Sequence, residues 1–176
     1  MVNSKIRPAT RKDIVSLTDI IRGSFRDVAE RFGLTKENCP KHASNCEADW
    51  IEKDMNRGVT YLILEDDGQA SGCVAWERPN DELIYLERLS VLPDRRERGF
   101  GKALIDYVFE EAKQAGARSV NIGIIAAQTE LKKWYQKTGF IEGDTREFTH
   151  LPFLVTFMNY TLDANAEVLK QKQKGD

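Results

Sequence analysis

A strand-like run (84–92) and a helix-like run (102–114) flank a short turn, residues 96–101, which reads Arg-Glu-Arg-Gly-Phe-Gly. A glycine-rich turn from a strand into a helix presents unpaired backbone N–H groups at the positive end of the helix dipole, where phosphates bind. The two glycines allow close approach of a ligand to the backbone. The same turn carries fixed positive charge on Arg95, Arg96 and Arg98. This segment therefore predicts a site for an anionic cofactor.

The turn matches neither of the two commonest nucleotide fingerprints, G-x-x-x-x-G-K-[ST] and G-x-G-x-x-G. It resembles the [QR]-x-x-G-x-[GA] turn of the GNAT superfamily of acetyl-CoA-dependent N-acetyltransferases, with Arg96, Gly99 and Gly101 at the defining positions. Residues 134–140, Trp-Tyr-Gln-Lys-Thr-Gly-Phe, resemble the second hallmark of that family, an aromatic-Tyr-x-x-x-Gly-Phe segment. The resemblance covers residues 6–162.

Hydrophobic periodicity and turn signals predict the element order β-α-α-β-β-β-α-β-α-β-β. Thr10 with Asp13 predicts a helix start, as does Ser44 with Glu47, and residues 66–69 (Asp-Asp-Gly-Gln) predict a hairpin. The fold class is α/β (α+β), with one mixed sheet of about seven strands and helices on both faces. The resemblance implies that the strand before the glycine turn splays from its neighbour and that the cofactor enters the gap.

Length and composition predict one domain, residues 1–162, followed by a polar tail, residues 163–176. A formal net charge of −2 gives no electrostatic footprint for nucleic acid or membrane binding, so neither partner is expected. No apolar run approaches the ~18 residues of a membrane span, and the start lacks the apolar core of a signal peptide. The three cysteines are expected to be reduced thiols in a cytoplasmic protein. A homodimer is left open.

The resemblance implies a set of residues that bind acetyl-CoA, the cosubstrate. The turn would hold its phosphates, and the strand backbone near Leu89 and Val91 would bind the pantetheine arm and the acetyl carbonyl. Gln128 stands where many family members have an asparagine, and Lys132 either reaches the phosphates or is solvated. The complete set is Leu89, Ser90, Val91, Arg96, Glu97, Arg98, Gly99, Phe100, Gly101, Lys102, Gln128 and Lys132.

Glu87 and Tyr135 are the candidate catalytic residues. Simple alternation places Glu87, Leu89 and Val91 on one face of their strand and Arg88 with Ser90 on the other. A carboxylate in a central strand faces water, a cleft or an ion-pair partner. Glu87 is thus either a general base for an ammonium acceptor or a cross-strand ion pair, with Arg78 one candidate partner.

The resemblance implies that Tyr135 lies near the sulfur of CoA and protonates the departing thiolate. A phenol with a pKa near ~10 can donate a proton to a thiolate with a pKa near ~8.5. The alternative is a half-buried aromatic residue that packs the helix on the sheet.

Cys39, His42 and Cys46 form a C-x-x-H-x-x-x-C pattern, but structural zinc sites usually take their four ligands as two separated pairs. No metal is expected. The resemblance implies instead that the loop carrying His42 covers the acceptor side. His150 either faces the same cleft or is a hydrogen-bonded loop residue.

These features together predict an N-acetyltransferase that moves the acetyl group of acetyl-CoA to a primary amine of a small metabolite by direct attack. Two alternatives stay open at this point. One is acetylation of a protein or peptide amine, and the other is a catalytically weak sensor that binds acyl-CoA.

Overall fold

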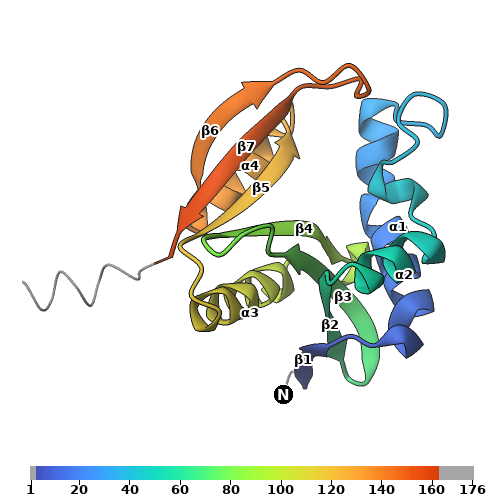
Figure 1. Ribbon diagram of the computed structural model, residues 1–176. Helices are drawn as coiled ribbons and strands as arrows, with labels where there is room; N and C mark the ends of the chain where they lie inside the picture. Colours follow the sequence, from blue (N-terminus) through green and yellow to red (C-terminus); the bar gives the residue numbers. More distant parts are fainter. Residues whose placement is uncertain (1–2, 163–176) are drawn as a thin grey trace, which may run out of the picture.

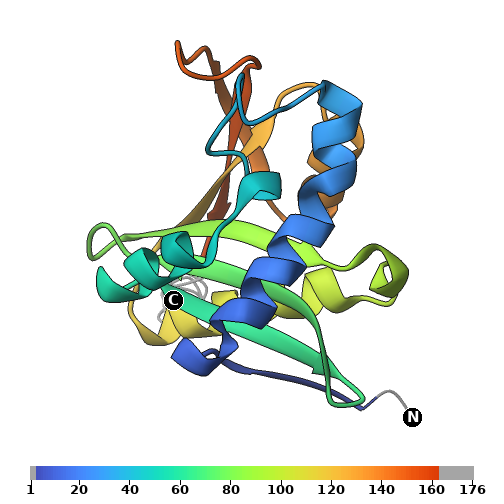
Figure 2. The same cartoon turned by 90° about the vertical axis from the view of Figure 1, so that its right-hand side faces the viewer.

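A seven-stranded mixed sheet forms the centre of the protein in the order β1-β2-β3-β4-β5-β7-β6 (Figures 1 and 2). The computed structural model describes residues 3–162, so the polar tail lies outside the described residues. Every neighbouring pair is antiparallel except β4 with β5. The predicted mixed sheet is confirmed. Its strands are β1 (Ser4–Pro8), β2 (Thr60–Asp66), β3 (Gln69–Glu77), β4 (Leu83–Val91), β5 (Ser119–Ile125), β6 (Ile141–Arg146) and β7 (Val155–Thr161).

Four α-helices cover the two faces of the sheet (Figure 1). Helices α1 and α2 pack on one face and α3 and α4 on the other, each pair with its own buried apolar cluster. The helices are α1 (Ile14–Phe32), α2 (Ala48–Asn56), α3 (Phe100–Gln114) and α4 (Thr129–Lys137), with the short 3-10 helices η1 (Arg11–Asp13), η2 (Ala43–Asn45) and η3 (Pro93–Arg95). None of the helices in residues 3–162 combines the length and apolar character that a membrane crossing requires.

Alternation along β2 supplies both layers of the core. Leu62 and Leu64 pack with α3, while Tyr61 and Ile63 pack with α1 and α2. A strand that is buried on both faces has a continuous run of apolar residues, and β2 has such a run at residues 61–64. The sheet therefore has two dry faces on this half of the molecule and fixes both helical layers in place.

Local signals confirm two of the predicted starts and turns. The capping box of Thr10 and Asp13 is formed, and η1 leads directly into α1. The hairpin between β2 and β3 turns at Asp67 (φ 50°) and Gly68 (φ 77°), the left-handed pair that a two-residue hairpin needs.

The predicted capping box of Ser44 and Glu47 is wrong. Helix α2 begins at Ala48, and its N-cap Glu47 makes no side-chain hydrogen bond to the helix. The Ser44 N–H donates a hydrogen bond to Nδ1 of His42, and the Ser44 hydroxyl is hydrogen-bonded to the same nitrogen. His42 thereby caps the separate turn η2. Because Ser44 is held in that turn, it is not available to cap α2.

Strands β4 and β5 are paired only at their beginnings. The parallel register joins Leu83–Tyr85 to residues 119–121, whereas β5 pairs with β7 along its whole length. Beyond Tyr85 the two strands therefore have no ladder hydrogen bonds between them. This separation, which the family resemblance implied, opens the sheet beside the glycine turn.

Candidate active site

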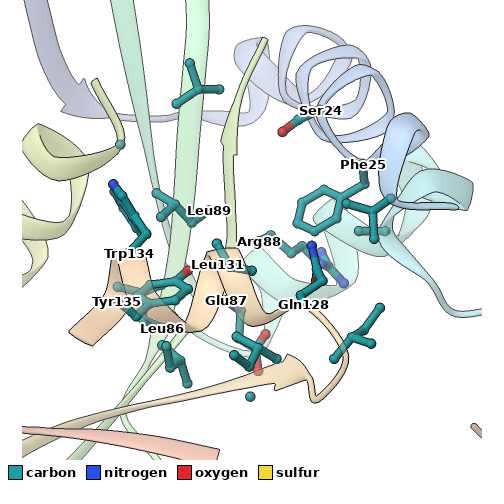
Figure 3. A pocket seen from close by; sticks show the side chains of 18 of the residues that line it. Ser24, Phe25, Leu86, Glu87, Arg88, Leu89, Gln128, Leu131, Trp134 and Tyr135 are labelled. Atoms are coloured by element: carbon teal, nitrogen blue, oxygen red, sulfur yellow. The ribbon is translucent and has the colours of Figure 1, made fainter. Parts of the chain in front are cut away.

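The open seam between β4 and β5 leads into a cavity of about 1000 Å³. Its lining comes from α1, β4, the glycine turn, β5, α4 and the segment entering β7. Figure 3 shows Glu87 and Leu89 of β4 facing this space together with Trp134 and Tyr135 of α4. A cavity of this size, with mostly apolar walls and a few polar groups, is typical of a ligand site.

The glycine turn brings a row of free backbone donors to one end of the cavity. Within the described part of the chain, no acceptor is found for the N–H groups of residues 97–102. Glu97 (φ 60°) and Gly99 (φ 79°) adopt left-handed conformations, which curl the turn before α3. Free donors at a helix N-terminus favour an anion by both hydrogen bonding and the helix dipole.

The side chain of Arg96 ties the turn to α1. Its guanidinium donates to the Val91 carbonyl (3.2 Å), to Asp27 Oδ2 (2.7 Å) and to the Ser24 carbonyl (2.8 Å). The hydrogen bond from Arg96 lowers the pKa of Asp27, so this carboxyl stays ionised and paired. Arg96 therefore fixes the position of the turn, and its positive charge is already compensated.

Arg95 and Arg98 are paired in the same way. Both donate to Oδ2 of Asp66 at 2.7 Å, and the Asp66 side chain is fully buried. The three arginines that were expected to add fixed positive charge are thus present at the turn, but carboxylates compensate their charges. Within the described residues, the backbone N–H groups of the turn are unpaired, whereas the charge of each guanidinium group is compensated by a carboxylate.

Gly101 at the start of α3 faces Trp134 of α4. A Cβ atom at Gly101 would lie 3.3 Å from the ring of Trp134, which is closer than usual for such a contact. The two hallmark segments, 96–101 and 134–140, thus touch each other directly. Tyr135, which follows Trp134 in α4, also lines the cavity beside the seam between β4 and β5.

A β-bulge interrupts β4 at Arg88. Cys73 of β3 pairs with Ser90 and Ala75 pairs with Glu87, so the single residue between Cys73 and Ala75 opposes two residues of β4. Arg88 has φ 51°, a left-handed conformation that is uncommon for residues with a side chain. The predicted regular alternation of β4 is wrong because of this extra residue.

The bulge changes which side chains share a face. Leu89 and Val91 pack toward α3, whereas Glu87 lies opposite Ala75 and shares its side of the sheet, which is the side of α1 and α2. Ser90 is buried on that same side, with its hydroxyl donating to the Arg88 carbonyl. The side chains of Glu87 and Leu89 therefore lie on opposite faces of the sheet, and those of Glu87 and Arg88 lie on the same face.

Arg88 is a lining residue that sequence reasoning missed. Its Nη1 donates to Asp54 Oδ2 at 2.6 Å and contacts the hydroxyl of Tyr61, which itself donates to Asp54 Oδ2 at 2.6 Å. Arg57 holds the other oxygen of Asp54 at 3.0 Å. This buried network anchors the bulge to α2. No local sequence signal predicts it, because Asp54 and Arg88 are 34 positions apart.

Glu87 lines the cavity as a half-buried carboxyl group. No described residue forms an ion pair with it, and Arg78, the partner considered from sequence, pairs with Asp81. Burial raises the pKa of Glu87, with a smaller contribution from the nearby charge of Glu77. A carboxyl group with a raised pKa in a cleft is suited to accept a proton near neutral pH.

Tyr135 is buried and lies on the cavity wall, with its hydroxyl directed into the cavity (Figure 3). Burial raises the pKa of this phenol, which therefore remains protonated at neutral pH. Its ring packs edge-on against Phe140, at 5.4 Å between ring centroids. The side chain is thus fixed and presents a proton donor.

The structure places most, but not all, of the expected site residues on the cavity. Ser90, Arg98, Lys132 and His150 do not line it. Lys132 pairs with Glu142 at 2.8 Å, and His150 is an exposed neighbour of Phe148. The expected residues that do line it are Glu87, Leu89, Val91, Arg96, Glu97, Gly99, Phe100, Gly101, Lys102, Gln128, Tyr135 and His42.

His42 faces the cavity from the loop between α1 and α2. Burial lowers its pKa, and Nδ1 accepts from the Ser44 N–H, so the neutral ring carries its proton on Nε2. Cys39 and Cys46, which flank His42 in sequence, are buried in separate apolar clusters. Within residues 3–162 no group of three or more potential ligands is placed to hold a metal ion.

Comparison with known proteins assigns this architecture to a family. Residues 17–140 match the acetyltransferase (GNAT) family, and the chain belongs to that family. This confirms the resemblance and the fold that it implied.

Individual relatives match at moderate identity. The chain is 28% identical over 93 residues to an amino-acid acetyltransferase of Vibrio atlanticus, covering 52% of this chain and 19% of that protein. It is 26% identical over 92 residues to the uncharacterized N-acetyltransferase YvbK of Bacillus subtilis, covering 52% of this chain and 59% of that protein. The aligned region thus spans less than two thirds of either relative.

A solved structure shows the same fold over nearly the whole chain. The acetyltransferase yncA of Salmonella typhimurium, determined with acetyl-CoA, has a TM-score of 0.69 and 21% identity, covering 92% of this chain and 95% of that one. At this identity the likeness concerns the fold alone.

Proposed function

We propose that this protein is an N-acetyltransferase that moves the acetyl group of acetyl-CoA to a primary amine of a small metabolite. One observation carries the proposal. One cavity is lined by the glycine turn, by Glu87 and by Tyr135, a protonated phenol. Within residues 3–162 the N–H groups of residues 97–102 have no acceptor and Glu87 has no ion-pair partner. Family membership and the relatives named as N-acetyltransferases support the same activity.

The residues present fit acetyl-CoA, which supplies an acetyl thioester when bound. The turn, residues 97–102, would bind the pyrophosphate through backbone N–H groups, with Lys102 in the first turn of α3 adding positive charge. The strand edge at Leu89 and Val91, which lacks a β5 partner, would bind the pantetheine arm. Gln128 would lie beside that arm at the start of α4. The Arg96 side chain acts by holding the turn against α1.

Glu87 is the proposed general base. Most primary amines are protonated at neutral pH, and the ammonium must lose a proton before nitrogen can attack the thioester carbonyl. Glu87 accepts this proton, directly or through a water molecule. Burial raises the pKa of Glu87, which makes the carboxylate a stronger base than an exposed one.

Tyr135 is the proposed general acid. As the new N–C bond forms and the C–S bond breaks, negative charge develops on sulfur, and the phenol donates its proton there. Atoms and charges balance. An ammonium and the thioester give an amide, a thiol and one released proton. No covalent acyl-enzyme is required.

Thiol release from acetyl-CoA tests the proposal. Wild-type protein is assayed with a panel of diamines, amino acids, aminoglycosides, arylalkylamines and short peptides, with mass spectrometry of the acetylated product. A small amine should accelerate thiol release and gain one acetyl group. If acetyl-CoA binds but no amine in the panel is acetylated, the protein is a sensor and the proposed activity is wrong.

A further inference from the structure

Three neighbouring strands present an uncovered patch of the sheet to the cavity. Tyr85 of β4, Gly123 of β5 and Phe157 of β7 all line it. Their chain neighbours, among them Ile84, Ile122 and Met158, are buried in the core under α3 and α4. Because side chains alternate along a strand, the three lining residues point to the opposite face, beyond the area that α1 and α2 cover.

This patch has a flat apolar floor. Gly123 pairs directly with Phe157 across the strands. A Cβ atom at Gly123 would lie 3.5 Å from the Phe157 ring and 3.3 Å from Cγ1 of Val155, so these side chains already lean over the glycine. Tyr85 continues the floor on the other side of the seam and is 38% exposed. Tyr85, Gly123, Val155 and Phe157 all line the same cavity, and a contiguous apolar surface of this kind marks a place where a ligand can bind.

Aromatic side chains also form the facing wall. Phe25 of α1 lines the cavity and is held edge-on by His42, with 5.8 Å between the ring centroids. Phe153, in the segment before β7, lines it next to the end of α1 and packs in the cluster with Ala29. A flat apolar group entering between floor and wall would contact aromatic rings on both sides, which favours an aromatic ligand.

The charges around the floor favour a cation. Glu87 is two residues along β4 from Tyr85 and has no ion-pair partner among the described residues. The nearest cations are compensated, Arg88 by Asp54 at 2.6 Å and Arg57 by Asp54 and Glu77. An ammonium group would find an unpaired carboxylate here. Among the described residues, a carboxylate attached next to that ammonium would find no uncompensated cation on the floor itself. Arg31, a cation that lines the cavity without an ion pair in residues 3–162, belongs to the last turn of α1, on the facing wall.

We propose that the acceptor is an arylalkylamine, a primary amine joined to a flat aromatic ring by a short aliphatic linker, with no carboxylate beside the amine. The ammonium lies at Glu87 and the ring lies on the floor formed by Tyr85, Gly123 and Phe157. Two residues along a strand span about 6.6 Å, which suits a linker of about two methylene groups. This assignment rests on the proposed acetyltransferase activity and names its substrate class.

The test compares matched acceptors in the thiol-release assay with wild-type protein. 2-Phenylethylamine is set against propylamine, which lacks the ring, and L-phenylalanine, which adds only the carboxylate. Spermidine and a tripeptide with a free N-terminus complete the set. We expect kcat/KM for 2-phenylethylamine to exceed that for propylamine and for L-phenylalanine by at least ~10-fold. Propylamine has no ring to bury on the floor, and L-phenylalanine carries a carboxylate that the floor does not match with a cation.

Variants locate the effect on the floor. Phe157→Ala and the more conservative Phe157→Leu should each raise KM for 2-phenylethylamine more than KM for propylamine or acetyl-CoA, by ~10-fold for alanine. Ile141→Ala is the control, because Ile141 is 68% exposed on β6 and does not line the cavity. A CoA-induced rise in Tm in each variant verifies that the protein is folded.

The outcomes separate this inference from the activity on which it rests. If L-phenylalanine, spermidine or the tripeptide is the preferred acceptor, the arylalkylamine assignment is overturned and the acetyltransferase activity stands. Equal effects of Phe157→Ala on 2-phenylethylamine and propylamine would also overturn it. If no amine is acetylated although CoA raises Tm, the proposed activity fails and the assignment fails with it.

Discussion

The left-handed conformation of Arg88 decides which side chains reach the acceptor side of the cavity. A residue with a side chain at φ 51° is strained and persists only where its surroundings hold it. Asp54 and Tyr61 supply that restraint through hydrogen bonds to the Arg88 guanidinium. The consequence is that Glu87 and Arg88, although adjacent in sequence, share one face, and Glu87 is aimed into the seam.

Tyr135→Phe isolates the hydroxyl that the proposed mechanism uses. The ring and its packing on Phe140 are kept, so the fold should be unchanged. An acid that acts only as the thiolate leaves should affect kcat and not cosubstrate binding. We expect kcat to fall at least ~10-fold, below the usual ~10²–10⁴ range because solvent also protonates thiolates. Steady-state kinetics should show KM for acetyl-CoA within a few-fold of wild type, and an unchanged kcat would mean that Tyr135 only packs.

Glu87→Gln tests the general base through its pH dependence. The pKa of Glu87 is raised by burial, so the wild-type enzyme should gain activity as pH rises through a value above the ordinary 4.5. The glutamine variant should lose ~10²-fold or more in kcat/KM near pH 7. Its activity should recover as pH approaches the pKa of the amine, near ~10, because the amine then deprotonates without a base.

The pH–rate profiles of both proteins measure this effect. The ratio of wild-type to variant activity should shrink steadily between pH 7 and pH 10. A ratio that stays constant over that range would exclude Glu87 as the base and leave it a role in binding.

At the scale of elements, the turn from β4 to α3 is held from both sides. Arg96 attaches it to α1, and Arg95 with Arg98 attach it to the buried carboxylate of Asp66 at the end of β2. With the turn held in this way, the N–H groups of residues 97–102 have no acceptor among residues 3–162. A preorganised backbone site of this kind can bind a phosphate without first rearranging.

Lys102→Glu tests the turn with little risk to the fold. Lys102 is exposed and lines the cavity, and its pair with Asp106 is a surface contact worth only ~0.3–0.5 kcal/mol. A carboxylate there should repel phosphates and weaken CoA binding by ~10-fold or more, measured by calorimetric titration. Lys113→Glu, at the far end of the same helix, makes the same charge change and should leave CoA affinity unchanged. Equal losses in the two variants would indicate only long-range charge.

Sequence predicted the features that depend on neighbouring residues. The turn at Gly99, the hairpin at Gly68 and the helix that carries Tyr135 all have short-range signals, and the structure has each of them. The bulge at Arg88 depends on pairing with β3 and on Asp54, and no short-range pattern reports either. Regular alternation therefore misplaced Glu87 relative to Leu89.

The pairing of the arginines at the glycine turn also could not be predicted, because their partners are distant in sequence. Asp27 is 69 positions from its partner Arg96, and Asp66 is 32 positions from its partner Arg98. The sequence alone therefore did not show that carboxylates pair with the arginines of the turn. The floor of Tyr85, Gly123 and Phe157 was missed because it exists only when three strands are assembled. Distant contacts, more than element types, limited the prediction of the site.

At the scale of the whole molecule, the sheet is two paired units joined at a narrow seam. Strands β1 to β4 form one unit and β5 to β7 the other, with only Leu83–Tyr85 paired across the junction. Trp134 of α4 lies beside Gly101 at the start of α3, so α4 is close to the glycine turn that follows β4. The cavity is thus a consequence of sheet divergence, and its two ends belong to different units.

Amide hydrogen exchange with and without acetyl-CoA tests the central claim, that this seam and turn bind the cosubstrate, most directly. The N–H groups of residues 97–102 have no acceptor in the described chain and should exchange rapidly in the free protein. Saturating acetyl-CoA should slow exchange in peptides covering 97–102 and in the β4 segment 87–91, while peptides from β6 should be unaffected. Protection that is absent from residues 97–102, or that appears only outside the seam, would contradict the assignment of this cavity as the acetyl-CoA site.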